Sequence, residues 1–197
     1  MDEPEMDEHE YAGTPTLIVI SGPAGFGKTT LAHAVARSVG CPAICRDEIK
    51  EGMVHAHPEF DGATPGDPLT RRTFPLFFEV LELLLKAGVT VVAEAAFQDW
   101  NWKRGLEPLQ GIADIRIVQC TADVEAAHAR NLRRFADTPT RRAHADAQGP
   151  QTLEEATKHY ESFVRLSLPV PTITVDTTDG YDPSLEEIVA FAAGRAS

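Results

Sequence analysis

The chain has 197 residues, of which 43% are hydrophobic and 24% charged, as expected for one globular domain with a full-sized core. The net charge of −12, with six acids and no Lys or Arg among residues 1–10, disfavours long nucleic acid as a partner and predicts an acidic disordered tail over residues 1–13. Without an apolar run long enough to cross a bilayer, a leader-like start or enough cysteines for a disulfide framework, we expect a cytoplasmic protein that spans no membrane.

The first predicted elements are a strand and a helix joined by a glycine-rich turn. Residues 17–20 form a short, continuous, β-branched apolar run, which is typical of a strand buried on both faces. The turn covers residues 22–27. Apolar residues then recur at helical spacing over residues 28–39, and Gly40 is a natural end for that helix.

Strands and helices continue to alternate along the rest of the chain. Four more strands are predicted, over residues 43–45, 89–93, 113–120 and 173–175. Helices are predicted over residues 47–54, 71–87, 99–110, 123–135 and 152–166, with a last one starting after Ser184. Residues 55–69 have no periodicity and predict a functional loop. This alternation predicts an α/β three-layer sandwich with a five-stranded parallel sheet, formed by residues 14–197.

The turn after the first strand carries a phosphate-binding motif. Its residues, Gly22-Pro23-Ala24-Gly25-Phe26-Gly27-Lys28-Thr29, match G-x-x-x-x-G-K-[ST]. In such a loop the backbone N–H groups surround phosphate oxygens, the lysine adds a positive charge and the Thr hydroxyl ligates Mg²⁺. The motif lies between a predicted strand and a predicted helix, as this mechanism requires, so we expect it to bind ATP or GTP with Mg²⁺. The residues expected to contact nucleotide here are Gly22, Ala24, Gly25, Phe26, Gly27, Lys28, Thr29 and Thr30.

A second segment makes the chain resemble a known family. Residues 21–30, taken with Cys45-Arg46-Asp47-Glu48 at the end of the second predicted strand, resemble the small P-loop kinases. This family includes the kinase domain of phage polynucleotide kinase, chloramphenicol phosphotransferase and zeta toxins. The resemblance extends over most of residues 16–178 and implies a P-loop NTPase fold and phosphoryl transfer. In the polynucleotide kinase the second strand ends in an Arg-Asp pair whose Asp is the general base, which implies that role for Asp47.

The position of Asp47 supports the same role on physical grounds. Ligands of open α/β sheets bind beyond the carboxyl ends of the strands, and Asp47 follows the second strand beside the phosphate loop. A carboxylate there can accept the proton of an attacking substrate hydroxyl. The alternative is that Asp47 only caps the helix predicted over residues 47–54. Arg46 could hold a substrate phosphate or an acidic partner, or could simply be a surface arginine.

An acid also follows the third predicted strand. Glu94 stands where P-loop proteins place a residue that orients the water shell of Mg²⁺, although the usual aspartate is missing. We expect Glu94 to contact metal or substrate; it could instead be the general base or make a structural hydrogen bond.

An arginine-rich stretch resembles the lid of these kinases. It contains Arg130-Asn131-Leu132-Arg133-Arg134, and the lid is expected at about residues 134–150. In the polynucleotide kinase, matching arginines touch the phosphates. Arg130 and Arg134 are four residues apart on one helix face, so we expect both to neutralise phosphate charge. The alternative is a solvated basic face.

Two further residues complete the predicted site. Trp100 follows the third strand and could stack on a flat acceptor, whereas Thr178 follows the fifth strand and could contact the nucleotide base. The phenylalanines of residues 71–87 could line a pocket but have the spacing of core residues.

The sequence therefore predicts an ATP- or GTP-dependent phosphotransferase that moves the γ-phosphoryl group to a hydroxyl of a small molecule. An antibiotic, a nucleoside or a sugar would each fit, and antibiotic resistance is one such role. The first alternative is a 5′-hydroxyl polynucleotide kinase, which the acidic body disfavours. The second is a non-catalytic nucleotide-binding regulatory protein, although the N-K-x-D motif of GTPases is missing. The acceptor, the preferred purine and the oligomeric state stay open.

Overall fold

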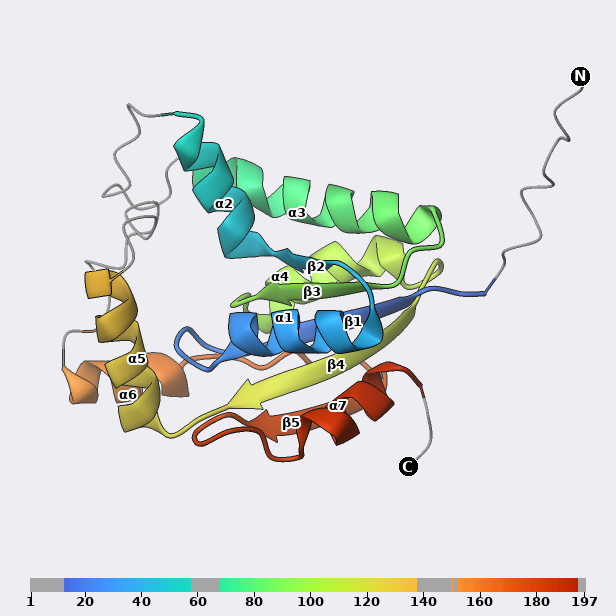
Figure 1. Ribbon diagram of the computed structural model, residues 1–197. Helices are drawn as coiled ribbons and strands as arrows, with labels where there is room; N and C mark the ends of the chain where they lie inside the picture. Colours follow the sequence, from blue (N-terminus) through green and yellow to red (C-terminus); the bar gives the residue numbers. More distant parts are fainter. Residues whose placement is uncertain (1–12, 58–67, 138–149, 151, 195–197) are drawn as a thin grey trace, which may run out of the picture.

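The computed structural model describes residues 13–57, 68–137, 150 and 152–194. A five-stranded sheet with the order β2-β3-β1-β4-β5 lies at its centre, and every neighbouring pair of strands is parallel (Figure 1). The strands are β1 (Thr16–Ser21), β2 (Ala43–Cys45), β3 (Val91–Ala95), β4 (Asp114–Thr121) and β5 (Thr172–Asp176). The predicted five-stranded parallel sheet is confirmed.

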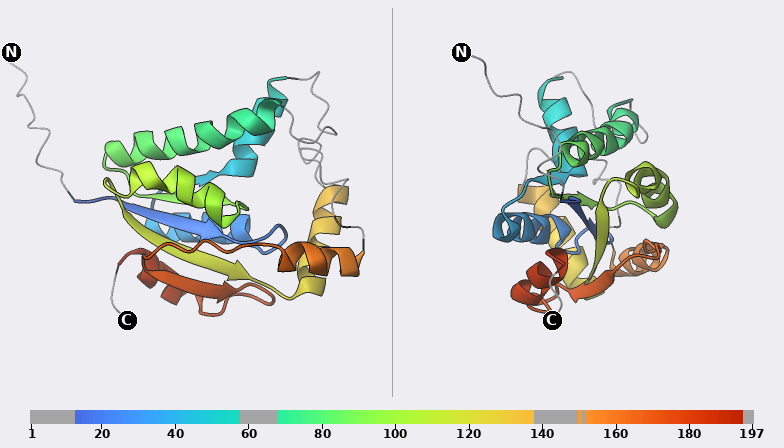
Figure 2. Two further views of the ribbon diagram at one scale, coloured as in Figure 1. Left: turned by 180° about the vertical axis from the view of Figure 1, so that it is seen from behind. Right: turned by 90° about the vertical axis from the view of Figure 1, so that its right-hand side faces the viewer.

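Helices connect the strands and cover both faces of the sheet. They are α1 (Lys28–Val39), α2 (Arg46–His55), α3 (Pro68–Lys86), α4 (Asp99–Leu106), α5 (Val124–Asp137), α6 (Leu153–Glu161) and α7 (Leu185–Ala192), with a 3₁₀ helix, η1 (Glu107–Leu109), after α4. Helices α1 and α7 cover one face, and α3 and α4 cover the other (Figure 2). Among the described residues, none of the helices has both the length and the apolar character needed to traverse a bilayer.

Strand β1 is continuously apolar because both of its faces are buried. Ile18 and Ile20 pack into the core under α1 and α7, whereas Leu17 and Val19 pack into the core under α3 and α4. Successive side chains of a strand point to opposite faces, and both faces of this central strand are covered by helices. All four side chains are therefore fully buried.

Strand β3 ends later than predicted, and this changes the position of Glu94. The strand runs to Ala95, and Glu94 pairs in register with Ile20 of β1 and Cys45 of β2. The prediction that the strand ends before Glu94 is therefore wrong. Because side chains alternate along a strand, Glu94 shares the face of Val92, which is the face covered by α1.

Helix α6 is shorter than predicted, since it ends at Glu161 rather than at residue 166. Tertiary hydrogen bonds hold the chain that follows in a non-helical path. The side chain of Gln98 accepts from the Val164 N–H at 2.7 Å, and the carboxylate of Asp99 accepts from the Ser167 N–H at 2.8 Å. These contacts take the place of further helical hydrogen bonds.

Candidate active site

The loop between β1 and α1 has a conformation and surroundings that require glycine. Gly25 and Gly27 have positive φ angles of 81° and 67°, and Gly27 is the N-cap of α1. A Cβ atom on Gly25 would lie 2.5 Å from the carbonyl oxygen of Ala127, and one on Gly27 would lie 3.0 Å from Oγ1 of Thr177. The loop thus turns its backbone closely against α5 and the segment after β5, as a backbone cradle for phosphate requires.

Gly25→Ala is expected to destabilise the protein more than Gly40→Ala. Both glycines have nearly the same φ, 81° and 83°, so each alanine adds a left-handed strain of about 1–2 kcal/mol. Only Gly25 also faces a carbonyl oxygen within 3 Å, since nothing lies within 4 Å of a Cβ at Gly40. Urea unfolding of both variants measures the difference. Equal losses of unfolding free energy would show that the loop has room for a methyl group.

Aromatic packing between Phe26 and Tyr160 supports the phosphate loop. The ring of Phe26 meets the ring of Tyr160 edge-on at 4.9 Å, and the Tyr160 hydroxyl accepts from Nδ2 of Asn131 at 3.0 Å. Helices α5 and α6 therefore support the loop together. Phe26 is buried, so its predicted role in nucleotide binding could come only from its backbone. No motif in the sequence indicated Tyr160 or Asn131.

Lys28 lies at the mouth of the loop with a buried ammonium group. Its side chain is 6% exposed, and Nζ donates to the carbonyl oxygen of Pro23 at 2.8 Å. Nζ also lies 3.7 Å from Oε1 of Glu94, whose side chain is 5% exposed. A buried cation of this kind requires a partner of opposite charge, and Glu94 supplies it.

Glu94 connects this lysine to the start of α1. The Thr29 hydroxyl donates to Oε2 of Glu94 at 3.0 Å. Burial raises the pKa of Glu94, the nearby charge of Lys28 lowers it, and the charge of Asp47 raises it again. A hydroxyl and a carboxylate are hard oxygen ligands of the kind that Mg²⁺ prefers, so Thr29 and Glu94 fit this ion with its waters.

Glu94→Gln is expected to change how stability depends on pH. The pKa of Glu94 in the folded chain is raised above its ordinary value of 4.5, so the folded state holds this proton more tightly than the unfolded state. Above pH 4.5 the wild type should therefore lose unfolding free energy relative to the glutamine variant, by at most about 1.4 kcal/mol per pH unit. Urea unfolding of both proteins from about pH 5 to about pH 9 measures this difference. A difference that is constant, or that grows in favour of the wild type, contradicts the prediction.

Asp47 does not cap α2. The N-cap position belongs to Cys45, and no side chain there makes a capping hydrogen bond. Asp47 stands in the first turn with a side chain that is 39% exposed, and its Oδ1 lies 3.0 Å from Nη1 of Arg46. The predicted proximity of Asp47 to the phosphate loop is consistent with its effect on the pKa of Glu94.

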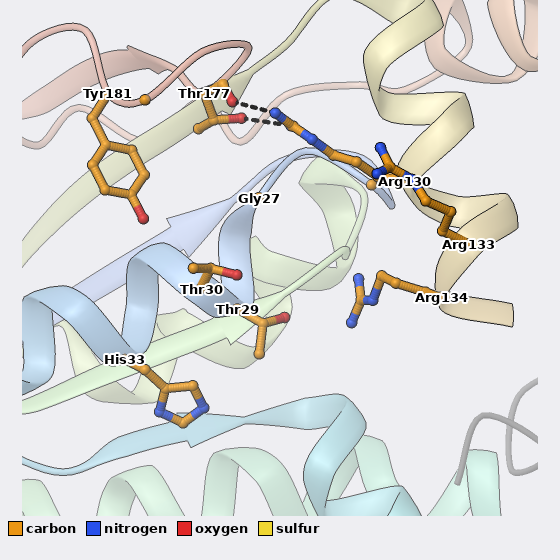
Figure 3. Close-up of a pocket in the computed structure, with 11 residues that line it drawn as sticks. Gly27, Thr29, Thr30, His33, Arg130, Arg133, Arg134, Thr177 and Tyr181 are labelled. Atoms are coloured by element: carbon orange, nitrogen blue, oxygen red, sulfur yellow. Dashed lines mark hydrogen bonds between the residues drawn. The ribbon is translucent and has the colours of Figure 1, made fainter. Parts of the chain in front are cut away.

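Two cavities lie at this edge of the sheet. The first, of about 850 Å³, is formed by the phosphate loop, α5 and the segment after β5 (Figure 3). Its lining residues are Gly25, Gly27, Thr29, Thr30, His33, Arg130, Arg133, Arg134, Thr177, Gly180 and Tyr181. The second, of about 530 Å³, lies among α2, α3, α4 and the end of β3. Its lining residues are Arg46, Asp47, Thr70, Arg71, Phe74, Ala96, Phe97, Trp100, Asn101 and Arg104.

The two predicted lid arginines both line the first cavity, but they point toward different elements. Arg130 donates through Nη2 to the carbonyl oxygens of Thr177 and Thr178, at 2.7 and 2.8 Å. Arg134 instead points toward Thr29 at the phosphate loop (Figure 3), and its charge lowers the pKa of Glu94. Contact with phosphate stays a prediction for both. Most of the expected lid, residues 138–149, lies outside the described residues.

The segment after β5 differs in detail from the prediction. The hydroxyl of Thr178 accepts from the Asp123 N–H at 2.8 Å, whereas Thr177, Gly180 and Tyr181 line the first cavity. The Thr178 hydroxyl is therefore turned toward the start of α5. A contact between Thr178 and the base stays an untested prediction.

The aromatic residues divide between core and cavity. Phe77 and Phe78 are buried in the core, as their helical spacing indicated, whereas Phe74 lines the second cavity. Trp100 is 62% exposed and lines the same cavity, while Trp102 is fully buried and donates to the Ser21 hydroxyl at 3.0 Å. Stacking of Trp100 on an acceptor stays a prediction.

One side-chain cluster was not predicted. Nε2 of His33 lies 2.7 Å from Oε1 of Glu48 and 3.9 Å from Sγ of Cys45, so three potential metal-ligating atoms lie within 4.8 Å of one another. Burial and the neighbouring carboxylates Glu94 and Glu48 raise the pKa of the Cys45 thiol, which therefore stays protonated. The hydrogen bond between His33 and Glu48 accounts for the cluster by joining α1 to α2.

Comparison with known proteins identifies a family and a fold for this chain. A family model described as "AAA domain" matches residues 17–160. A chain from Chloroflexus aurantiacus described as a "putative kinase" is 24% identical, with a TM-score of 0.81 over 94% of this chain and 100% of that chain. A gluconokinase from Sinorhizobium meliloti is 18% identical, with a TM-score of 0.57 over 93% of this chain and 94% of that chain. A shikimate kinase from Acinetobacter baumannii, in complex with shikimate, is 18% identical, with a TM-score of 0.57 over 92% of this chain and 94% of that chain.

A search of curated proteins finds no match. At these identities the likeness to solved structures establishes the fold, whereas the family model covers well over half of the chain. The chain therefore belongs to this AAA domain family, and it has the fold of the small P-loop kinases.

Proposed function

We propose that the protein is an ATP- or GTP-dependent phosphotransferase that moves the γ-phosphoryl group to a hydroxyl of a small molecule. The observation that carries the proposal is the cluster of Lys28, Thr29 and Glu94, in which Lys28 and Glu94 are buried and Thr29 lines the first cavity. The charge of Asp47 in the second cavity reaches Glu94. These contacts support a nucleotide site in the first cavity and an acceptor site in the second.

In the proposed reaction each cavity holds one substrate. The triphosphate lies in the first cavity, with its phosphates against the loop N–H groups and Lys28. The acceptor lies in the second, with its hydroxyl beside Asp47. Asp47 accepts the hydroxyl proton as the oxygen forms a bond to the γ-phosphorus, and the bond from that phosphorus to the β–γ bridging oxygen breaks. The products are a phosphate monoester and the nucleoside diphosphate.

Charge stabilisation accounts for most of the catalysis in such a reaction. In the proposed reaction Lys28 and Arg134, whose side chain points toward Thr29, supply positive charge to the phosphates, and Arg130 holds the segment after β5 that lines the same cavity. Thr29 and Glu94 would hold Mg²⁺ with its waters. When bound, that ion would neutralise charge on the phosphate oxygens.

The comparisons support a small acceptor. Gluconokinase and shikimate kinase are named for small hydroxylated compounds, and both share the fold of this chain. An antibiotic, a nucleoside or a sugar is of suitable size for a cavity of about 530 Å³. We place the protein in the cytoplasm, where the nucleotide is available. A role in antibiotic resistance is one form of this proposal.

An acceptor screen with γ-labelled ATP and GTP tests the proposal. Label should move to one class of small hydroxyl compound and to neither DNA nor RNA ends. Label found only on 5′ ends would favour the polynucleotide kinase. Slow hydrolysis that no acceptor accelerates, with the same rate in Asp47→Asn, would favour a nucleotide-binding regulator.

A further inference from the structure

The second cavity is unusually basic for this protein. It is lined by Arg46 of α2, Arg71 of α3 and Arg104 of α4, and Asp47 is the only acid among the described residues that line it. Within the described lining, three arginines against one aspartate leave two net positive charges, although the whole chain carries −12. Chance placement on an acidic protein would give the opposite sign, so the cavity concentrates positive charge against the overall field.

The arginines have hydrogen-bonding capacity to spare. Among the described residues, only Arg46 of the three forms an ion pair, with Asp47. The Nε atom of Arg46 is buried and has no hydrogen-bond partner in that part of the chain. Arg104 lies 5.8 Å from the centre of the Phe74 ring and makes no ion pair there. The guanidinium groups of Arg71 and Arg104 therefore keep N–H donors that an anionic ligand in the cavity can accept from.

The remaining wall is aromatic. Phe74 and Phe97 pack with ring centres 5.2 Å apart, and Trp100 presents an indole ring that is 62% exposed. Trp100 and Arg104 are four residues apart on α4, so they share one helix face. The cavity therefore combines an apolar surface with guanidinium groups, which suits a small organic anion.

We infer that the acceptor phosphorylated by this protein carries an anionic group, a carboxylate or a phosphate monoester, which Arg46, Arg71 and Arg104 bind while Asp47 faces the hydroxyl. The inference rests on the proposed function and narrows it to hydroxy acids and phosphorylated alcohols.

Quenching of tryptophan fluorescence tests the charge of the cavity without a nucleotide. The chain has two tryptophans, and Trp102 is fully buried, so dissolved ions report on Trp100. Relative to free N-acetyltryptophanamide at the same ionic strength, iodide should quench Trp100 at least about threefold better than caesium. The double variant Arg71→Gln/Arg104→Gln should lose this preference, while quenching by neutral acrylamide stays the same. Arg37→Gln, at the exposed end of α1, is the matched control.

Phosphoryl transfer to matched pairs tests the acceptor class. The pairs are 4-(hydroxymethyl)benzoate with its amide, gluconate with sorbitol, and glycerol 3-phosphate with glycerol. In at least one pair the anionic member should be phosphorylated with a kcat/KM about 10 to 100 times that of its neutral partner. The double variant should lose that advantage through KM. The first two pairs report on a carboxylate and the third on a phosphate.

Two results would overturn the inference. One is equal normalised quenching by iodide and caesium, and the other is phosphorylation of the neutral partner as well as the anionic one in every pair that is phosphorylated. Either leaves the proposed phosphotransferase intact. If the proposed phosphotransferase function is wrong, triphosphate binding should be unchanged in Lys28→Ala. That outcome would not change the quenching of Trp100 by iodide and caesium.

Discussion

Lys28→Ala is expected to abolish measurable binding of Mg²⁺-triphosphate and to lower kcat/KM for phosphoryl transfer by at least about a thousandfold. The Pro23 carbonyl and Glu94 hold the ammonium group at the mouth of the loop. Residues 22–27 contain no other charged side chain, so nothing else in the loop can supply this charge. Calorimetric titration with ATP and GTP in Mg²⁺ measures the loss of binding.

The same substitution leaves Glu94 buried without its cation, so loss of folding must be separated from loss of binding. The double variant Lys28→Ala/Glu94→Gln removes both charges and should recover stability but not binding. Lys86→Ala, which removes a 62%-exposed ammonium at the far end of α3, is the control for net charge. Triphosphate uptake that persists in a folded Lys28→Ala protein would refute the nucleotide site.

The phosphate loop and α1 could be predicted because their signals are local. The glycines, Lys28 and Thr29 are contiguous, and α1 begins and ends at the predicted residues, between Gly27 and Gly40. The predicted end of strand β3 was wrong because that end depends on the pairing of Glu94 with Ile20 of β1 and Cys45 of β2. Both of these strands are distant from Glu94 in the sequence. No local pattern carries that information.

The basic lining of the second cavity also could not be predicted from local sequence patterns. Arg46, Arg71 and Arg104 come from three helices, and the packing of those helices brings them together. The sequence predicted Arg46 as a substrate-binding candidate but gave no role to Arg71 or Arg104. Asp47 and Trp100 could be predicted as acceptor-site candidates because each closely follows a strand at the carboxyl edge of the sheet, where topology alone brings residues together.

Asp47→Asn is expected to lower kcat by about a hundredfold to ten-thousandfold and to leave triphosphate binding within about twofold. The amide keeps the shape of the carboxylate but cannot accept the proton of the acceptor hydroxyl. Because Cys45 and not Asp47 occupies the N-cap of α2, and because Asp47 is 39% exposed, the unfolding free energy should change by less than about 1 kcal/mol. Single-turnover transfer and urea unfolding measure the two effects.

Glu48→Gln is the matched control, since it removes the same charge from the same helical turn at a side chain that is 47% exposed. The rival base is Glu94, but Oε2 of that residue accepts from Thr29 and Oε1 faces Lys28. Asp47 lies in the wall of the second cavity and can reach an acceptor there. If Asp47→Asn turns over at the wild-type rate while Glu94→Gln binds triphosphate but transfers nothing, the base is Glu94 and the assignment of Asp47 is wrong.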